Sequence, residues 1–221
     1  MTRYLSPILL GAIGCAVLIA LGVWQLQRLE WKEGVLSQIE ARLAGDPVTL
    51  SDDLTEAEDE YRATRFRGTP VGDVLYVLDS GTAAGTGYRV IQAFETSDMR
   101  VLVDRGLVGL DGRGTVLATD EMDVSGHLLW PDDVNSSTPA PEGNLWFGRD
   151  VAAMSDVLET APVMVVLAAT SVEDPGVTPL PVDTSGIPND HLSYAITWFS
   201  LAVVWLAMTG YWISRIRART A

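Results

Sequence analysis

The sequence has few of the residues that form disulfides and hold metal ions. It contains one cysteine, Cys15, and two histidines, His127 and His191. A single cysteine excludes an intramolecular disulfide and, without a partner thiol, argues against thiol exchange. Because His127 has no Cys, His or Met neighbours at metal-site spacing, we interpret it as an ordinary surface or half-buried residue. Copper delivery is not expected, since the segment between the apolar runs has no cysteine or methionine-rich cluster for Cu(I).

Motifs that would indicate an enzyme are also missing. The chain has no nucleophile elbow, no metalloprotease helix motif and no Ser-His-Asp arrangement. The segment "DRGLVGLDGRG" (104–114) is rich in glycine but lacks a phosphate-loop lysine, so we interpret it as a turn. We therefore predict that the protein is not an enzyme. Its 29 Asp and Glu against 15 Lys and Arg also argue against nucleic-acid binding.

Charge is absent from two long apolar runs, residues 4–27 and 192–214. At about 1.5 Å per residue in a helix, each run is long enough to cross a hydrocarbon core of about 30 Å. The alternative for the first run is a cleaved signal peptide, but no small-x-small site followed by a polar mature start is present. We predict transmembrane helices over 5–27, continuing as a helix to about residue 43, and over 191–214.

The distribution of charge predicts how these spans are oriented. All 29 Asp and Glu lie between Glu30 and Asp190, whereas the tail at 215–221 has three arginines and no acid. The positive-inside tendency places this tail, and with two spans also the N-terminus, in the cytoplasm. The region 44–188 then lies outside. We expect a bacterial inner-membrane protein with a periplasmic domain; in a mitochondrion this domain would face the intermembrane space.

Short extended segments, separated by clusters of Gly, Asp, Pro and Ser, fill the region between the spans. Among them we expect two helices, an acidic one with Ser51 as its N-cap and one in "GRDVAAMSDVLET" (148–160). The predicted fold class is α+β, a two-helix transmembrane hairpin carrying one β-rich antiparallel periplasmic domain with a few helices. The expected strands are "YRATRFRGTPV", "DVLYVLDS", "GYRVIQAFET", "RVLVDRGLVGL", "DEMDVSGHLLW" and "PVMVVLAAT".

His191 lies where the polar segment becomes the second apolar run, and helical spacing predicts an aromatic and alanine-rich face below it. Small residues on that face leave room for a flat ligand, and an imidazole at its outer end could bind iron through Nε2. In the alternative interpretation, His191 only lies at the membrane interface beside Tyr194. The predicted face comprises His191, Tyr194, Ala195, Trp198, Ala202 and Trp205.

Two cations, Arg28 and Lys32, lie one turn apart just outside the first span. They could pair with anionic groups of a membrane-embedded ligand, such as porphyrin propionates. The alternative is that they bind lipid headgroups or the nearby Glu30 and Glu33. Trp24 lies at the same end of the span, where indole rings prefer the headgroup zone.

Several segments together resemble the Surfeit locus (Surf/Shy) protein family of cytochrome c oxidase assembly factors, over nearly the whole chain. The strongest parts are "LGVWQLQRLEWK" (21–32), which leaves the first span, and "NDHLSYAITWFSLA" (189–202), which enters the second. Between them, further segments follow the family's order. These are "GYRVIQAFE", "VLVDRGLV", "VSGHLLWPDD" and "NLWFGRDVAAM".

The resemblance implies a two-span protein that helps to assemble a haem-copper terminal oxidase. It implies haem a as bound cargo, with His191 as the ligand of the haem iron. The implied partners are the catalytic subunit of the oxidase, haem a synthase as a second candidate, and membrane lipid. The alternative function is a scaffold without haem, which stabilises an oxidase assembly intermediate through the periplasmic domain. The expected haem-binding residues are His191, Tyr194, Trp198, Arg28, Lys32 and Trp24.

Overall fold

The computed structural model describes residues 2–82 and 84–218. Its contacts separate two units, a helical hairpin within residues 1–38 and 184–221 and a β-rich domain over 39–183. Two helices are long and apolar enough to cross a membrane, Tyr4–Leu43 and His191–Ala218. The expected α+β class is therefore confirmed. Arg219 of the expected basic tail lies outside the described residues.

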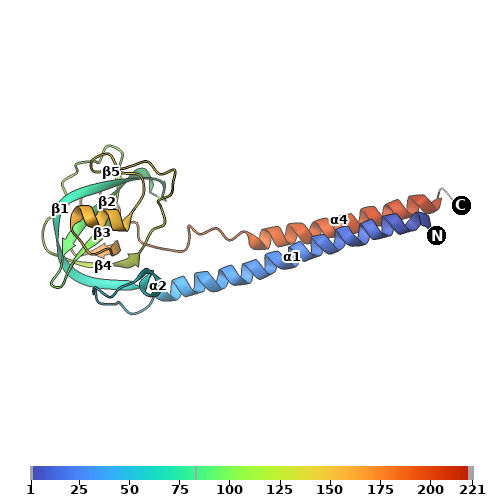
Figure 1. Ribbon diagram of the computed structural model, residues 1–221, viewed down its shortest axis with the longest axis horizontal. Coiled ribbons are helices and arrows are strands. Elements are labelled where there is room, and N and C mark those ends of the chain that lie inside the picture. The colour runs from blue at the N-terminus through green and yellow to red at the C-terminus, as the bar shows by residue number, and fades with distance from the viewer. Residues whose placement is uncertain (1, 83, 219–221) are drawn as a thin grey trace. The chain divides into compact units, whose positions relative to one another are not determined.

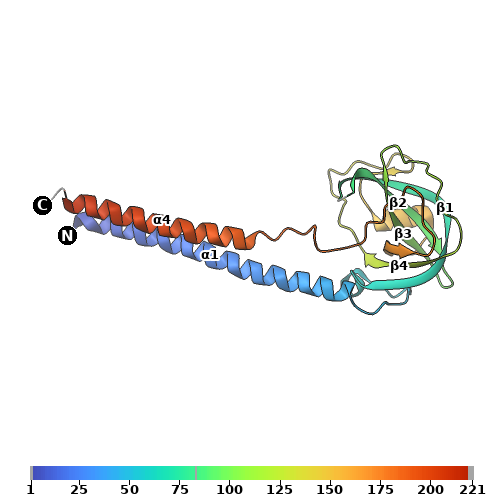
Figure 2. The same cartoon turned by 180° about the vertical axis from the view of Figure 1, so that it is seen from behind.

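The hairpin consists of α1 (Thr2–Leu43) and α4 (His191–Ala218), which lie side by side and antiparallel (Figure 1, Figure 2). As expected, α1 continues from the first apolar run into the polar segment without a break. The most apolar 18-residue windows have mean hydropathies of 2.3 in α1 and 1.6 in α4. Most side chains of both helices are exposed in the isolated chain, as expected for surfaces that face lipid.

Glycines of α1 let large side chains of α4 approach its backbone. A Cβ atom on Gly22 would lie 2.6 Å from the Phe199 ring, and one on Gly14 would overlap the Trp205 ring. The Trp205 indole Nε1 also donates a hydrogen bond of 3.1 Å to the carbonyl of Gly11. Small residues of this kind allow close helix packing in a membrane, where no hydrophobic effect drives association.

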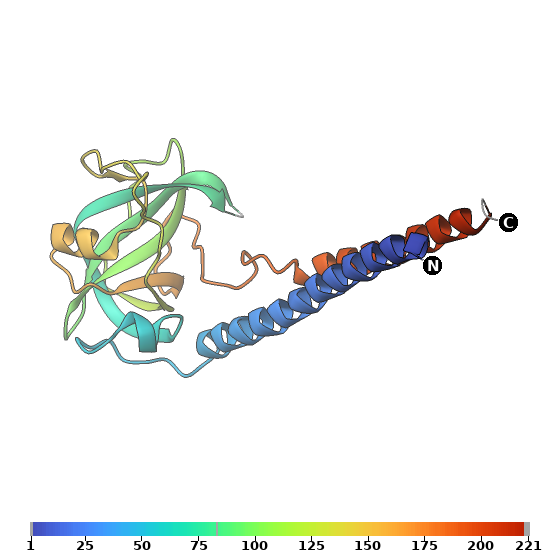
Figure 3. The ribbon, with the colours of Figure 1, turned by 45° about the vertical axis from the view of Figure 1, so that its right-hand side comes forward.

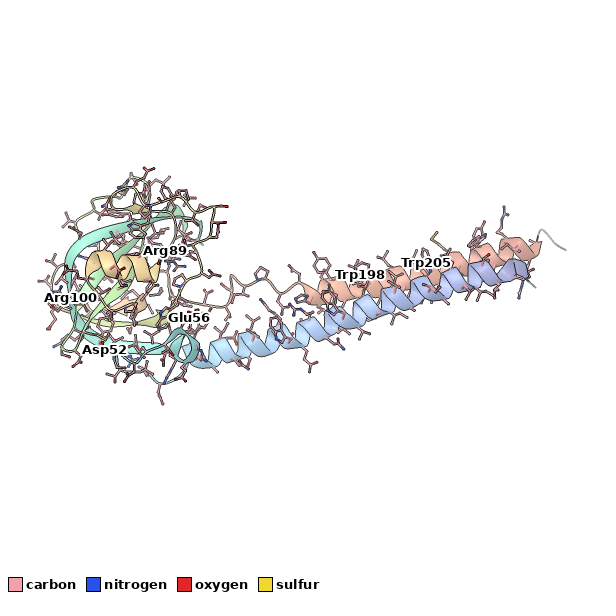
Figure 4. All side chains as sticks on the ribbon, in the orientation of Figure 1. Asp52, Glu56, Arg89, Arg100, Trp198 and Trp205 are labelled. Atoms are coloured by element: carbon pink, nitrogen blue, oxygen red, sulfur yellow. The ribbon has the colours of Figure 1, made fainter. Side chains whose placement is uncertain are left out.

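On the side of α4 that faces α1, the same kinds of residue recur every seven positions. His191, Trp198 and Trp205 are partly buried at one position of the repeat, whereas Ala195 and Ala202 are buried at the other. Figure 4 labels Trp198 and Trp205, two turns apart along α4. This repeat keeps one stripe of α4 against α1 over several turns. We call the contact between the two helices the seam.

The β-rich domain is a closed barrel (Figure 3). The strands pair in the order β2-β3-β6-β4-β1, β1 also pairs with β2, and β5 adds to β1. Four pairings are antiparallel as expected, but β3–β6 and β1–β5 are parallel. The elements are α2 (Glu56–Asp59), β1 (Ala63–Thr82), β2 (Gly85–Glu95), β3 (Arg100–Gly109), β4 (Met122–Leu129), β5 (Leu145–Trp146), α3 (Val151–Leu158) and β6 (Met164–Thr170).

The long strand β1 closes the barrel by pairing with both of its neighbours. Residues 63–68 pair with β4, and residues 69–82 pair with β2. The register with β2 shifts between Val71 and Val74, where Gly72 has a φ of +70°. A glycine at positive φ in such a bulge lets the strand bend sharply. The two strands that we expected in this region are therefore one bent strand.

The helices of the domain agree only in part with expectation. The helix in "GRDVAAMSDVLET" is confirmed as α3, and the Asp150 side chain caps it by accepting a hydrogen bond of 3.0 Å from Ala153 N–H. The expected acidic helix starting at Ser51 is wrong, because α2 has four residues and begins after Thr55. Its acids favour the first turn but oppose a longer helix, since the C-terminal end of the helix dipole repels them.

Asp104 and Arg105 lie inside β3, within the expected strand "RVLVDRGLVGL", so the turn that we expected over 104–114 begins only after Gly109. Both charges are paired. The Asp104 carboxylate is fully buried and lies 2.8 Å from Arg89 Nη1 and 3.5 Å from Arg149 Nη1. Arg105 is 1% exposed, and its Nε donates a hydrogen bond of 2.8 Å to Asp174. Paired in this way, buried charges are tolerated in a strand that otherwise contributes apolar residues to the core.

The same network affects the titration of Asp79. Burial alone would raise the pKa of Asp79, but hydrogen bonds from Arg89 and the Gly81 N–H, with the charges of Arg89 and Arg149, lower it. Because the folded-state pKa is lowered, Asp79 stabilises the fold above its unfolded pKa of about 3.9. This contribution is lost as the pH falls through the folded-state pKa.

Replacing Asp104 by alanine should lower the free energy of unfolding by about 3 kcal/mol, because buried guanidinium groups lose a partner. The control is Asp123→Ala, which removes an exposed pair with Arg67 at 3.0 Å and should cost less than about 1 kcal/mol. Urea unfolding of the full chain in detergent, followed by near-ultraviolet circular dichroism, measures both. Equal losses would contradict the stabilising role of the buried network.

Candidate functional site

His191 is tied to α1 by a hydrogen bond across the seam. Its Nδ1 lies 2.8 Å from Oε1 of Gln25, which is buried at 9% exposure, while the imidazole is half-buried. An amide oxygen only accepts hydrogen bonds, so this contact places the ring proton on Nδ1. The neutral ring then has its lone pair on Nε2, the atom that would bind a metal.

The candidate cations lie farther along α1 from Gln25. Lys32 is seven residues on, so it lies on the same face about 10 Å along the axis, and it is partly buried. Arg28 is three residues on, about 4.5 Å along the axis, and is exposed. Its guanidinium lies 4.4 Å from the centroid of the Trp31 ring. Both cations are thus within two turns of the residue that holds the imidazole.

The aromatic candidates differ in burial. Trp198 is partly buried on the seam, whereas Tyr194 is 56% exposed and Trp24 is 50% exposed. Tyr194 and Ala195 are neighbours in the sequence but lie on different sides of the helix, since Ala195 is buried against α1 and Tyr194 is exposed. The single aromatic and alanine-rich face that we expected is divided into a packed stripe and an adjacent exposed flank.

Arg28 and Tyr194 lie on one flank of the hairpin. Arg28 lies three residues after Gln25 on α1, and Tyr194 lies three residues after His191 on α4. Around its own helix axis, each is therefore rotated by about 60° in the same sense from the hydrogen-bonded residue. In antiparallel helices, equal rotations of the same sense lead to the same side of the pair. The structure thus brings a cation and an aromatic ring to one side of the imidazole, at the end of the seam where α4 begins.

A bare metal ion has little to bind here. Among the described residues, no group of three or more His, Cys, Asp or Glu side chains could hold one. His191 would supply a single nitrogen, which suits a metal that a macrocycle already chelates, such as a haem iron with an open axial position. The surrounding apolar helices suit a ligand with a large apolar body.

The other histidine has a different role. His127 lies on β4, and its Nε2 is 3.2 Å from the carbonyl oxygen of Leu43, the last residue of α1. Its buried Nδ1 has no hydrogen-bond partner in the described part of the chain. The ring therefore caps the end of a helix rather than facing an open site.

Gln25 is the site residue that sequence reasoning missed as a candidate. Its signal was a polar amide inside an uncharged apolar run, because a polar side chain within a membrane span needs a partner in the bundle. Asn189, two residues before His191, has a buried Oδ1 that lacks a hydrogen-bond partner within residues 2–82 and 84–218. Spacing along either helix did not show which residues of the other helix these side chains would meet.

Comparison with known proteins identifies the family of this chain. The profile of the SURF1 family matches residues 12–203. This chain belongs to the SURF1 family. The matched region includes Gln25 and His191 together with the whole barrel.

Individual relatives cover most of the chain. A SURF1-like protein of Drosophila melanogaster is 31% identical over 216 residues, covering 85% of this chain and 71% of the relative. Surfeit locus protein 1 of Mus musculus is 30% identical over 233 residues, covering 93% and 74%. A SURF1-like protein of the bacterium Rickettsia felis is 29% identical over 203 residues, covering 84% and 87%. The SURF1 family is one of oxidase assembly factors.

The hydrogen bond to Gln25 predicts the tautomer of His191. In the full chain labelled with ¹⁵N-histidine, the His191 signal should show the proton on Nδ1 at a pH where the ring is neutral. Assignment is simple, because the chain has two histidines and His191→Ala removes one signal. Gln25→Leu should shift the signal toward the mixture of a free imidazole. A proton on Nε2 in the unsubstituted protein would contradict the assigned geometry.

Proposed function

We propose that the chain binds haem a at the end of the hairpin where α4 begins and delivers it to the catalytic subunit of a haem-copper oxidase. The observation that carries this proposal is the hydrogen bond from His191 Nδ1 to the buried Gln25, which leaves Nε2 available for iron. Family membership supports the oxidase as the destination.

Each candidate residue then has a physical role. His191 supplies one axial nitrogen, and Gln25 fixes the tautomer and orientation of its ring. Arg28 and Lys32 pair with the two propionates, whose charges need partners near the bilayer edge. Tyr194, Trp198 and Trp24 provide aromatic surface beside the porphyrin.

The site suits a carrier because it holds its cargo with one protein ligand. A single axial histidine leaves the sixth position of the iron for a ligand from the receiving protein. The long apolar tail of haem a remains in hydrocarbon, so transfer does not require it to cross water. Haem a synthase is the second proposed partner, as the enzyme that supplies the cargo.

We also propose that the protein lies in a bacterial inner membrane, with both termini in the cytoplasm and the barrel in the periplasm. The two apolar helices and the bacterial relative support this location. The arginine tail supports the orientation. His191 would then lie near the periplasmic surface of the bilayer.

The haem proposal predicts a specific loss on substitution of His191. The full chain, purified from cells that make haem a, should carry haem with an axial-histidine absorbance spectrum, and His191→Ala should lose it. Gln25→Leu should weaken retention by about tenfold, the lower end of the effect of removing the partner of a metal-bound histidine. His127→Ala is the matched control, because its ring caps the end of α1 at Leu43, and it should retain haem.

Equal haem content and an unchanged spectrum in His191→Ala would overturn the ligand role. Loss of haem in His127→Ala to the same extent would also overturn it, since the effect would then not be specific to the seam.

One observation favours the alternative function, a scaffold without haem: none of the six candidate haem-binding residues lies in the barrel unit, residues 39–183. This alternative predicts that the barrel acts through its surface alone. If haem delivery is the function, a chimera that carries the barrel on two unrelated transmembrane helices should not restore oxidase activity in cells lacking the protein. Full restoration would favour the scaffold and contradict the haem proposal.

A further inference from the structure

An apolar groove lies along the hairpin at the opposite end from His191. It has a volume of about 690 Å³, and much of its lining is exposed, with Leu10 at 53%, Met208 at 62% and Trp212 at 47%. The remaining lining residues are Pro7, Gly11, Trp205, Ala207, Thr209, Tyr211, Arg215 and Ile216.

The groove combines an apolar floor with a positive charge at one end. Arg215 is the one charged residue among the lining residues named above, and its side chain is exposed. The sequence has no Asp or Glu in residues 1–29 or after Asp190, so no side chain at this end of the hairpin carries a negative charge that could pair with this guanidinium. An occupant with an apolar chain and an anionic head would match both features.

The length of the groove matches one leaflet of a bilayer. Arg215 and Trp205 are ten residues apart on α4, about 15 Å along the helix axis. This is half of a hydrocarbon core of about 30 Å. His191 lies a further 14 residues away, about 21 Å from Trp205, so the groove is separate from the proposed haem site.

We propose that this groove binds an anionic phospholipid, with the phosphate at Arg215 and an acyl chain along Met208 toward Trp205. An arginine can donate two parallel hydrogen bonds to the oxygens of a phosphate, and Trp212 lies near the level where indoles meet headgroups. The proposal rests on the hairpin lying in a bilayer and does not depend on haem binding.

Native mass spectrometry of the full chain in detergent tests the proposal, with phosphatidylglycerol and phosphatidylcholine of identical acyl chains as probes. The first phosphatidylglycerol should bind more tightly than the first phosphatidylcholine. Arg215→Gln should weaken phosphatidylglycerol binding by about fivefold, the effect of one basic residue near an anionic lipid surface. Arg67→Gln, at an exposed position of the barrel, is the matched control and should leave this binding unchanged.

A second pair of variants tests the apolar part of the groove. Met208→Trp should fill it and weaken binding of both lipids, whereas Val203→Trp, at an exposed α4 position outside the groove lining, should not. Equal binding of the two lipids, or equal effects of the two members of either variant pair, would overturn the proposal. A photo-reactive residue at Leu10 that captures another protein instead of lipid in membranes would also overturn it.

Discussion

The hydrogen bond between His191 and Gln25 depends on how closely the two helices approach each other. Glycines on α1 face Phe199, Trp205 and Thr209 on α4, so the α4 side chains pack against the α1 backbone. This packing sets the register between the helices and brings the first residue of α4 level with Gln25. A larger side chain at Gly14 or Gly22 would separate the helices, and the imidazole would lose the partner that orients it.

A tightly packed seam and a site open to a large ligand need different surfaces, and the hairpin provides both. Ala195 and Ala202 are buried against α1, while Tyr194 and Trp24 remain exposed beside the seam. The haem that we propose would therefore lie against a flank of the hairpin instead of in a closed cavity. Such a position suits a carrier, because the cargo stays accessible to the protein that receives it.

The barrel has a hydrophobic core of its own. Its core consists mainly of β-strand side chains, to which α3 adds Met154 and Leu158, and the buried Asp104 and Arg105 are held by charge pairs. The bent strand β1 closes the barrel, because one part of it pairs with β4 and the other part pairs with β2. The sheet therefore has no open edge between β4 and β2. Closure of this kind gives the chain a domain with a core of its own outside the two apolar helices.

Much of the architecture was predictable from the sequence, because the determining properties are local. The lengths of the two uncharged runs indicated the helices, turn residues marked most of the strands, and Asp150 marked the start of α3. The start of the acidic helix was misplaced because it depends on Asp59, whose carboxylate accepts a hydrogen bond from Thr55 N–H and so favours a helix that begins after Thr55. The parallel pairing of β3 with β6 also escaped prediction, since pairing partners are set by the path of the whole chain.

For the site, the sequence by itself determined which residue types stand at the two ends of the apolar runs, including His191, Arg28 and Lys32. Only the tertiary structure decided that Gln25 meets His191, that Tyr194 is exposed while Ala195 is packed, and that Asp104 is buried between two arginines. The physical reason is that hydropathy and spacing act within one segment. Side-chain partners depend on the register and close approach of segments that are far apart in the chain.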